Sequence, residues 1–346
     1  MKFSLAKVKL PSLVNSLLAV ISAVLLTLSF PDFDLWFLAW FALIPLFFVI
    51  NREKESFVKS FVLGWIFGTS FFFGTCWWLT FAPITYGGVP AMIAYPLLFG
   101  AALVAGLFPA IFSAIFSLLL KRFGTYASLF APLVWTGSEF LRFSLTGNNW
   151  NAIGYSQAFT HELIQTAQYA GVYLIGFWIV FFNSLTTLIF IALLQIFGQN
   201  DELREKNKVG KYSLFSILLF TILIPALALS PDFNLEDNSN GEIESIVVAV
   251  QPNIPMNGLR YEDWLQLRER HVRLAENALQ KINEEPITNR RPSITVIFPE
   301  SPMNFQYEND REFQEFIKDF AIKNNVSVLF NSAEPNLRGD NLYNSA

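Results

Sequence analysis

The sequence predicts a polytopic α-helical membrane domain followed by a partial α/β domain, and three observations lead to this fold class. The chain is 53% hydrophobic and only 15% charged, against about 25% charged residues in ordinary globular chains. Long uncharged apolar tracts fill the chain up to residue 231. After residue 242, short β-branched runs alternate with charged amphipathic segments, which is the pattern of a layered α/β fold. We therefore expect a membrane domain over 1–231, a polar linker over 232–242 and an α/β domain over 243–346.

Seven apolar segments approach the roughly 20 residues that a helix needs to cross a bilayer. The first follows Lys2, Lys7 and Lys9, and because no small-residue cleavage site comes after it, we interpret it as a retained helix and not a signal peptide. The predicted spans are 12–30, 35–50, 57–80, 90–120, 125–143, 163–197 and 212–230.

Basic residues occur in alternate connections between these segments. The N-terminus and every second connection hold 3, 3, 2 and 4 Lys and Arg residues when Lys59 at the start of the third span is counted, whereas the other connections hold none. This is the positive-inside pattern of a chain with a cytoplasmic N-terminus. With an odd number of spans, everything after Ser230 would lie outside the cytoplasm.

The remaining composition excludes several classes of function. A formal net charge of −4 gives no reason to expect nucleic acid as a partner. The single cysteine, Cys76, allows no internal disulfide, and a thiol in its apolar surroundings is expected to be inert. The two histidines, His161 and His271, are far apart without clustered partners, so we predict no metal site and no cofactor.

The C-terminal part predicts three strands separated by two helices. The expected strands are Ile243–Gln251, the run from Ile294 that ends at Pro299, and Val326–Phe330. The expected helices are Tyr261–Glu284 and Asp310–Lys323, each with one apolar side.

Glu300 is the candidate catalytic residue of this α/β domain. It follows the central predicted strand, and Pro299 before it cannot continue a ladder. Open α/β sheets bind their ligands at the C-terminal ends of strands, where Glu300 would lie. A solvated glutamate in a turn is the alternative interpretation, and spacing does not decide between them.

Polar residues in the fifth predicted span form a second candidate site. Glu139 and Arg142 are three residues apart and share a helix face, and charges at membrane depth face a cavity or a partner. One interpretation is a site for a zwitterionic lipid headgroup, and the other is a structural pair that orients the helix. Trp150 and Tyr155 follow, and residues of these types are enriched at membrane interfaces.

Several motifs in order resemble one family, the apolipoprotein N-acyltransferases of the bacterial inner membrane. The resemblance covers almost the whole chain and is carried by the stretches Leu28–Leu46, Gly64–Leu79 (GWIFGTSFFFGTCWWL), Trp135–Arg142 (WTGSEFLR), Asn149–Gln157 (NWNAIGYSQ), Gly171–Tyr173, Val250–Pro255 (VQPNIP) and Phe298–Glu300 (FPE). It implies a multi-pass bundle followed by a nitrilase-like α-β-β-α sandwich on the periplasmic side.

The resemblance also implies a reaction. Nitrilase-type enzymes use a Glu-Lys-Cys triad, in which Glu300 would be the general base that takes the thiol proton. The thiolate would attack an acyl ester of a phospholipid and form a thioester. The lysine would stabilise the oxyanion. The N-terminal amine of a diacylglyceryl-cysteine apolipoprotein would then accept the acyl chain.

The chain departs from the family pattern in two places. The family's lysine and cysteine lie beyond the third strand, so we expect a C-terminally incomplete copy that is inactive by itself. After Asn253 the family often has a tryptophan, whereas here the nearest aromatic residue is Tyr261, which we take as a candidate lipid-binding residue with Trp150. The alternatives are a membrane-tethered carbon–nitrogen hydrolase acting on amides and a non-catalytic, truncated paralogue that binds lipid or lipoprotein.

Overall fold

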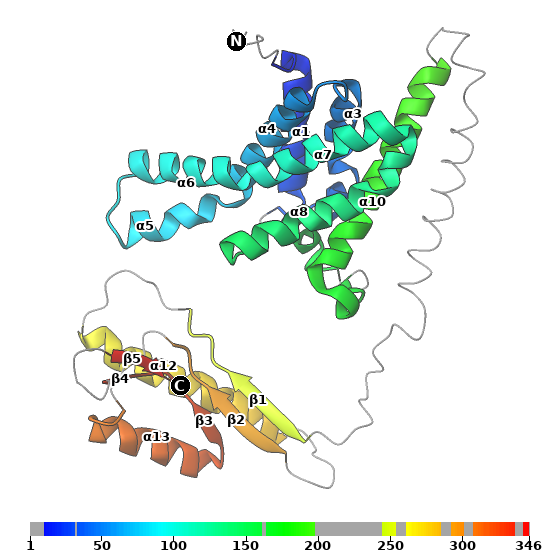
Figure 1. Cartoon of the computed structure of the whole chain (residues 1–346). Helices are drawn as coiled ribbons and strands as arrows, with labels where there is room; N and C mark the ends of the chain where they lie inside the picture. The colour runs from blue at the N-terminus through cyan, green and yellow to red at the C-terminus, as the bar shows by residue number, and fades with distance from the viewer. Residues whose placement is uncertain are drawn as a thin grey trace. The chain divides into compact units, whose positions relative to one another are not determined.

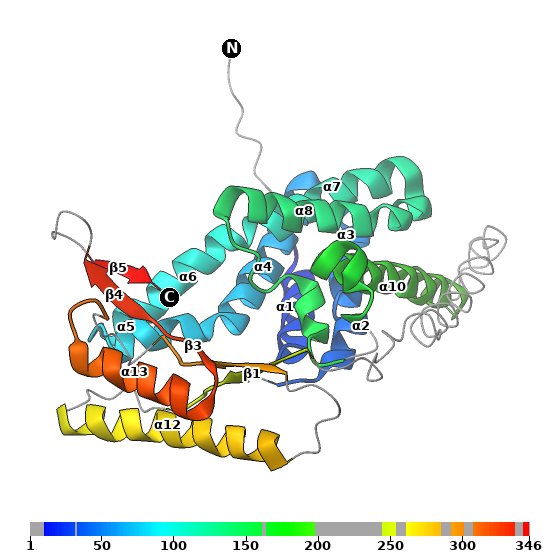
Figure 2. The same cartoon turned by 90° about the horizontal axis from the view of Figure 1, so that it is seen from below.

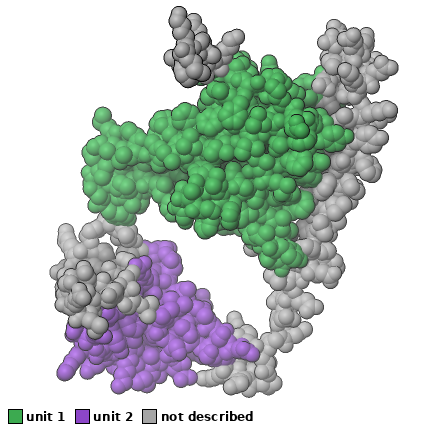
Figure 3. Space-filling view, in the orientation of Figure 1, with its two compact units in different colours: residues 1–234 green, residues 235–346 purple. Residues whose placement is uncertain are grey.

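The computed structural model describes residues 10–31, 33–160, 164–197, 244–253, 261–284, 292–300, 307–335 and 342–345. The chain divides into two compact units, residues 1–234 and residues 235–346 (Figure 3). We call them the helical unit and the sheet unit. The predicted seventh span over 212–230 and the linker over 232–242 lie outside the described residues.

The helical unit consists of α-helices joined by short 3₁₀ turns (Figure 1). Its elements in chain order are α1 (Leu13–Leu28), η1 (Trp36–Leu38), α2 (Ala39–Ala42), α3 (Ile44–Arg52), α4 (Phe57–Thr75), η2 (Trp77–Thr80), α5 (Phe81–Thr85), α6 (Ala91–Ala105), α7 (Leu107–Phe123), η3 (Gly124–Leu129), α8 (Ala131–Thr146), η4 (Ile153–Gln157) and α10 (Ala167–Phe197).

Three helical segments of the described residues are long and apolar enough to cross a membrane. They are Phe57–Thr75, Ala91–Leu129 and Ala167–Ile191, and two shorter apolar helices lie at Leu13–Leu28 and Trp36–Arg52. The predicted fifth span is not among them, because the 16 residues of α8 rise only about 24 Å, less than the ~30 Å of a hydrocarbon core. Three candidate spans establish a membrane protein, and the count of seven stays a prediction.

Helices α4 and α7 approach closely because small residues line their contact. A Cβ atom added to Gly64 would lie 2.5 Å from the carbonyl oxygen of Pro109, and one added to Gly68 would lie 2.8 Å from the Cα of Gly106. Lipid gives no hydrophobic force between helices, so close backbone packing through small residues stabilises the contact instead. Gly106 also separates α6 from α7, which divides the long predicted fourth span.

The predicted second span is also divided, at Leu43, where α2 ends and α3 begins. Asn183 of α10 forms hydrogen bonds with the main chain on both sides of this break. Its Oδ1 accepts a hydrogen bond from the Leu43 amide at 2.9 Å, and its Nδ2 donates to the Ala39 carbonyl at 2.8 Å. The side chain is fully buried, so it replaces main-chain hydrogen bonds that lipid could not supply.

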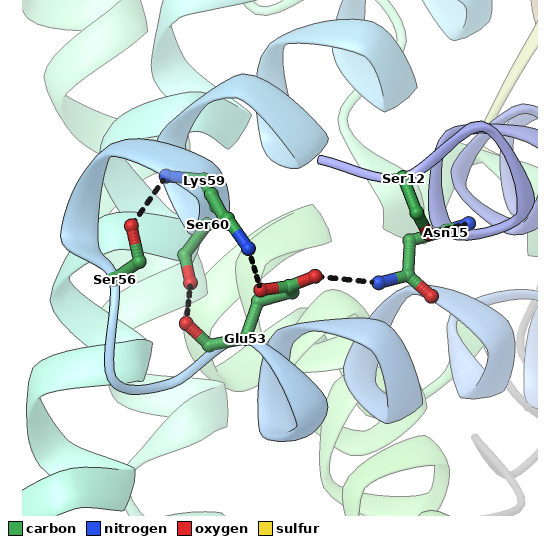
Figure 4. A network of polar contacts seen from close by, with 6 residues as sticks. All are labelled: Ser12, Asn15, Glu53, Ser56, Lys59 and Ser60. Carbon is green, nitrogen blue, oxygen red and sulfur yellow. Dashed lines mark hydrogen bonds and ion pairs between the residues drawn. The ribbon is translucent and has the colours of Figure 1, made fainter. Parts of the chain in front are cut away.

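A polar network joins the N-terminal ends of α1 and α4 to the end of α3 (Figure 4). Glu53, just after α3, accepts hydrogen bonds from Asn15 Nδ2 and Lys59 Nζ, both at 2.8 Å. Ser12 and Ser56 cap α1 and α4 by accepting from the amides of the third residue on. The network therefore joins the start of α1 to the end of α3 and the start of α4, where Glu53 lies 38 residues further along the chain than Asn15.

The sheet unit contains a three-stranded parallel sheet and a separate hairpin. Its elements are β1 (Ser245–Ala249), α12 (Tyr261–Glu284), β2 (Ser293–Ile297), α13 (Arg311–Asn324), β3 (Ser327–Leu329), β4 (Ser332–Pro335) and β5 (Leu342–Ser345). The order β1-β2-β3 is parallel throughout, and β4 pairs with β5 antiparallel. The three predicted strands and two predicted helices are confirmed, whereas the hairpin was not predicted.

Helices α12 and α13 cover one face of the parallel sheet (Figures 1 and 2). The core between them holds Val296 and Phe298 from the central strand region, Ala275 and Leu279 from α12, and Phe313, Ile317 and Phe320 from α13. On the opposite face, Val247 and Leu329 are exposed. Parallel sheets are usually covered on both faces, whereas the described residues cover only one face of this sheet.

Candidate functional sites

Glu300 lies at the C-terminal edge of the parallel sheet, three residues after β2 ends. Ladder bonds persist just beyond the strands, from the Val250 amide to the Ile297 carbonyl and from the Phe298 amide to the Leu329 carbonyl, both 2.9 Å. The Glu300 residue is exposed, and its main-chain carbonyl accepts a hydrogen bond from Asn331 Nδ2 at 3.3 Å.

All three strands end at this edge because they are parallel. It therefore also carries Asn253 after β1 and Asn331 after β3, and Asn253 has a positive φ of 48°. Parallel strands bring residues of distant chain positions to one edge, which is why ligands bind there. Spacing after the predicted strands could have identified these two asparagines, but only Glu300 was predicted as a site residue.

The two charges of α8 lie at the other candidate site, inside the helical unit. Glu139 and Arg142 are each only 6% exposed. Glu139 Oε1 accepts a hydrogen bond from the Ile153 amide at 2.8 Å, and Arg142 Nη1 donates to the Trp150 carbonyl at 2.6 Å. The guanidinium also lies over the ring of Phe72, 5.1 Å from its centroid, which is a cation–π contact.

Arg142 thus contacts the main chain of residues 147–152, which we call the 147–152 loop, and Glu139 contacts the amide of Ile153, which follows this loop directly. The loop connects α8 to η4. Two residues of the loop adopt left-handed backbone conformations, Gly147 (φ 67°) and Asn151 (φ 56°). Asn148 Oδ1 accepts from the Trp150 amide at 2.6 Å, the local turn that asparagine favours.

The 147–152 loop also contacts the end of α4. Asn151 Nδ2 donates to Thr75 Oγ1 at 2.8 Å and to Cys76 Sγ at 3.0 Å. The Trp150 ring, 50% exposed, lies 5.2 Å from the ring of Trp78. The sequence predicted Glu139, Arg142 and Trp150 as one region, and the structure brings them together. Asn151 was missed, because nothing in its sequence context points to α4.

The predictions for Tyr261 and Cys76 have different outcomes. Tyr261 begins α12, and the structure does not describe its side chain, so its lipid-binding role stays a prediction. Cys76 is buried, as expected for a structural thiol. Among the described residues, no group of three or more His, Cys, Asp and Glu side chains could hold a metal ion.

A bundle containing apolar helices long enough to span a bilayer, followed in the chain by a parallel α/β unit, defines a membrane protein with an appended α/β domain. Comparison with known proteins shows which family this membrane protein resembles. Residues 22–185 match the family described as the apolipoprotein N-acyltransferase N-terminal domain. Residues 22–185 are therefore similar to the N-terminal domain of that family, and the chain is similar to several proteins named apolipoprotein N-acyltransferase.

Relatives extend this similarity into the sheet unit. The chain is 28% identical to the apolipoprotein N-acyltransferase of Geobacter metallireducens over 88% of its length and 54% of the relative. It is 26% identical to that of Chlorobaculum tepidum over 90% of its length and 54% of the relative. It is 27% identical to apolipoprotein N-acyltransferase 1 of Treponema denticola, over 83% of the chain and 48% of the relative. The chain thus spans about half the length of these curated relatives.

Proposed function

We propose that this protein takes part in transferring a fatty acyl chain from a membrane phospholipid to the N-terminal amine of a diacylglyceryl-cysteine apolipoprotein. The observation that carries the proposal is the similarity to proteins of that name across both units. The chain combines apolar helices, which suit a lipid donor, with an exposed carboxylate at a sheet edge, which suits acid–base chemistry in water.

Glu300 is the proposed general base, which takes the proton of the attacking thiol and so generates the thiolate that forms a thioester with the acyl group. Its place at the C-terminal edge of a parallel sheet supports this role. We assign the thiol and the cationic partner to no residue of this chain. Cys76 is buried in the helical unit, and Lys323 forms an ion pair with Glu276 at 2.8 Å between α13 and α12.

The sheet unit is proposed to be part of a nitrilase-like α-β-β-α sandwich. Two helices on one face of a parallel sheet supply one α-β half. The exposed Val247 and Leu329 on the other face would pack against a second sheet layer. The alternation of basic residues supports an inner-membrane location with a cytoplasmic N-terminus and a periplasmic sheet unit.

Lipid contacts are proposed for Trp150 and Tyr261, with Glu139 and Arg142 as a candidate headgroup site. The half-exposed Trp150 ring suits the membrane interface, where tryptophan is enriched. For the two charges the headgroup interpretation competes with a structural one, and their contacts favour the structural interpretation developed below.

The experiment is an acyl-transfer assay on the protein expressed from its whole coding region. Phosphatidylethanolamine serves as the donor and a diacylglyceryl-cysteine peptide as the acceptor, with the product measured by mass spectrometry. We expect Glu300→Gln to lower the rate by about 10²–10⁴-fold, the usual contribution of a general base. The control is Glu308→Gln, an exposed glutamate of the same unit, which should leave the rate unchanged.

Two outcomes would overturn the proposal. One is a Glu300→Gln variant that keeps the parent rate. The other is release of ammonia from soluble amides without any transfer to the lipopeptide, which would indicate the amide-hydrolase alternative.

A further inference from the structure

The α8 charges and the 147–152 loop form one closed arrangement. Glu139 and Arg142 lie on one face of α8, three residues apart. Arg142 holds the carbonyl of Trp150, within the loop, and Glu139 holds the amide of Ile153, just after it. The loop is therefore fastened on both sides of Asn151 by charge-assisted hydrogen bonds, which are about twice as strong as neutral ones.

The space around the two charges is too small for a lipid headgroup. Glu139 and Arg142 line a cavity of about 20 Å³ together with aromatic side chains that include Phe72 and Trp135, room for about one water molecule. Glu139 Oε2 and Arg142 Nη2 are buried and have no hydrogen-bond partner among the described residues. The small volume of this cavity, and not the two unpartnered atoms, favours an internal role for the pair.

The loop in turn places two side chains against other elements. Trp150 stands beside Trp78 of η2, and Asn151 reaches Thr75 and Cys76 at the end of α4. Asn151 has a left-handed backbone, a conformation that few non-glycine residues adopt without local support. Support comes from both sides, since α8 holds the carbonyl of Trp150, immediately before Asn151, and the amide of Ile153, two residues after it.

We propose that Glu139 and Arg142 are positioning residues that clamp the 147–152 loop, setting Trp150 on Trp78 and seating Asn151 on the end of α4. The role of this clamp in catalysis rests on the proposed acyl transfer, in which Trp150 lies at the lipid interface. The clamp itself does not depend on that reaction. Neither charge contacts the lipid headgroup.

Cys76 provides a built-in reporter of the clamp. It is the only cysteine in the 346 residues and only 9% exposed, and Asn151 donates to its sulfur. Its rate of labelling by a maleimide therefore measures how often the loop leaves α4, since buried groups react through local opening. The chain is labelled in detergent micelles, and the modified peptide is identified by mass spectrometry.

The decisive comparison uses two substitutions of Glu139. Glu139→Gln keeps an oxygen that accepts from the Ile153 amide but removes the charge, and Glu139→Met removes both. We expect Glu139→Gln to label within about twofold of the parent chain and Glu139→Met to label at least about tenfold faster, the factor set by losing a strong buried hydrogen bond. Arg142→Met should behave like Glu139→Met.

Two control variants give the upper and lower limits of the labelling rate. Asn151→Ala removes the contact with Cys76 directly and defines the labelling rate of a released loop. Ser144→Ala, at an exposed position of the same helix, should label like the parent. Far-ultraviolet circular dichroism and elution as a single species confirm folding, and if Glu139→Met fails this check, Arg142→Met carries the comparison.

Two results would overturn the clamp. In the first, the Met variants stay as protected as the parent chain. In the second, Glu139→Gln keeps Cys76 protected but loses acyl transfer from phosphatidylethanolamine, which would restore the headgroup interpretation. Because labelling needs no substrate, a parent protein that transfers no acyl chain while the variants label as expected would count against the proposed function and not against the clamp.

Discussion

The helical unit and the sheet unit both have a core of large side chains, but they differ in the side chains that they expose. In the sheet unit, large side chains such as Phe313 and Phe320 fill the core, and burial from water is the main driving force. In the helical unit, many large apolar side chains are exposed, among them Met92 and Leu97, as suits a surface facing lipid. Its interior also holds large side chains such as Phe47, Phe67 and Phe112. Close contacts through small residues and buried polar side chains add to this core, because lipid gives no hydrophobic force between helices.

The same contrast separates the two candidate glutamates. Glu300 is exposed at a sheet edge, where a carboxylate can exchange protons with a substrate. Glu139 is buried among apolar residues and bound to a main-chain amide. A buried charge must be paired with hydrogen-bond donors, so its first role is structural. A position at membrane depth therefore does not by itself indicate that an acidic residue is catalytic.

The largest effect is expected from removing a large side chain in the sheet unit. Phe313 is fully buried and packs against Phe330 and Tyr307. We expect Phe313→Ala to lower the free energy of unfolding of this unit by about 3–5 kcal/mol, measured by hydrogen exchange of β2 and α13 peptides. Ile322→Ala, at an exposed position of α13, should change it by less than about 0.5 kcal/mol. Equal losses would contradict a burial-driven core.

The converse change tests the helical unit, where adding one methyl group should be harmful. In Gly64→Ala the new Cβ would press on the Pro109 carbonyl and on Ser113. We expect a loss of about 1–3 kcal/mol, typical of overpacking, seen as faster hydrogen exchange in α4 and α7. Gly100→Ala, where the space is open, should be neutral or stabilising. A stabilised Gly64→Ala variant would show that the helices are not in close contact.

A smaller effect is expected from removing the buried amide of Asn183 in α10. Asn183→Leu would leave the Leu43 amide and the Ala39 carbonyl without their partner. Hydrogen bonds between membrane helices contribute about 0.6–1.7 kcal/mol, and exchange of the α2–α3 region should report a loss in that range. Thr186→Val is the matched control, since this hydroxyl bonds only within its own helix. If both variants change the hydrogen exchange of the α2–α3 region equally, the hydrogen bonds of Asn183 do not stabilise the helical unit.

The smallest effect is expected at an exposed ion pair. Lys121 and Glu55 lie 2.9 Å apart, but their side chains are 55% and 71% exposed. Glu55→Gln should therefore cost less than about 1 kcal/mol, and less still in high salt. Glu53→Gln, which weakens the network of Figure 4, should cost more in the same thermal unfolding experiment. If Glu55→Gln cost more stability than Glu53→Gln, burial would not determine how much these ion pairs contribute.

The sequence determined the elements of this protein that depend on local pattern. Hydrophobic period and Pro299 located the three parallel strands and placed Glu300 after the central one, and helix α12 was predicted with its observed bounds. Composition and apolar length indicated a membrane protein. These features follow from chain-local physics, since a strand or a span is readable from consecutive side chains.

Tertiary structure decided which distant groups meet. Nothing near Leu43 announces that Asn183, 140 residues later, repairs a break in the chain there. Nothing in the segment WTGSEFLR shows that its two charges hold the backbone around Trp150 and Asn151 and do not face an open cavity. The reason is physical: a buried polar group must find a partner wherever packing provides one, and packing is a property of the whole fold.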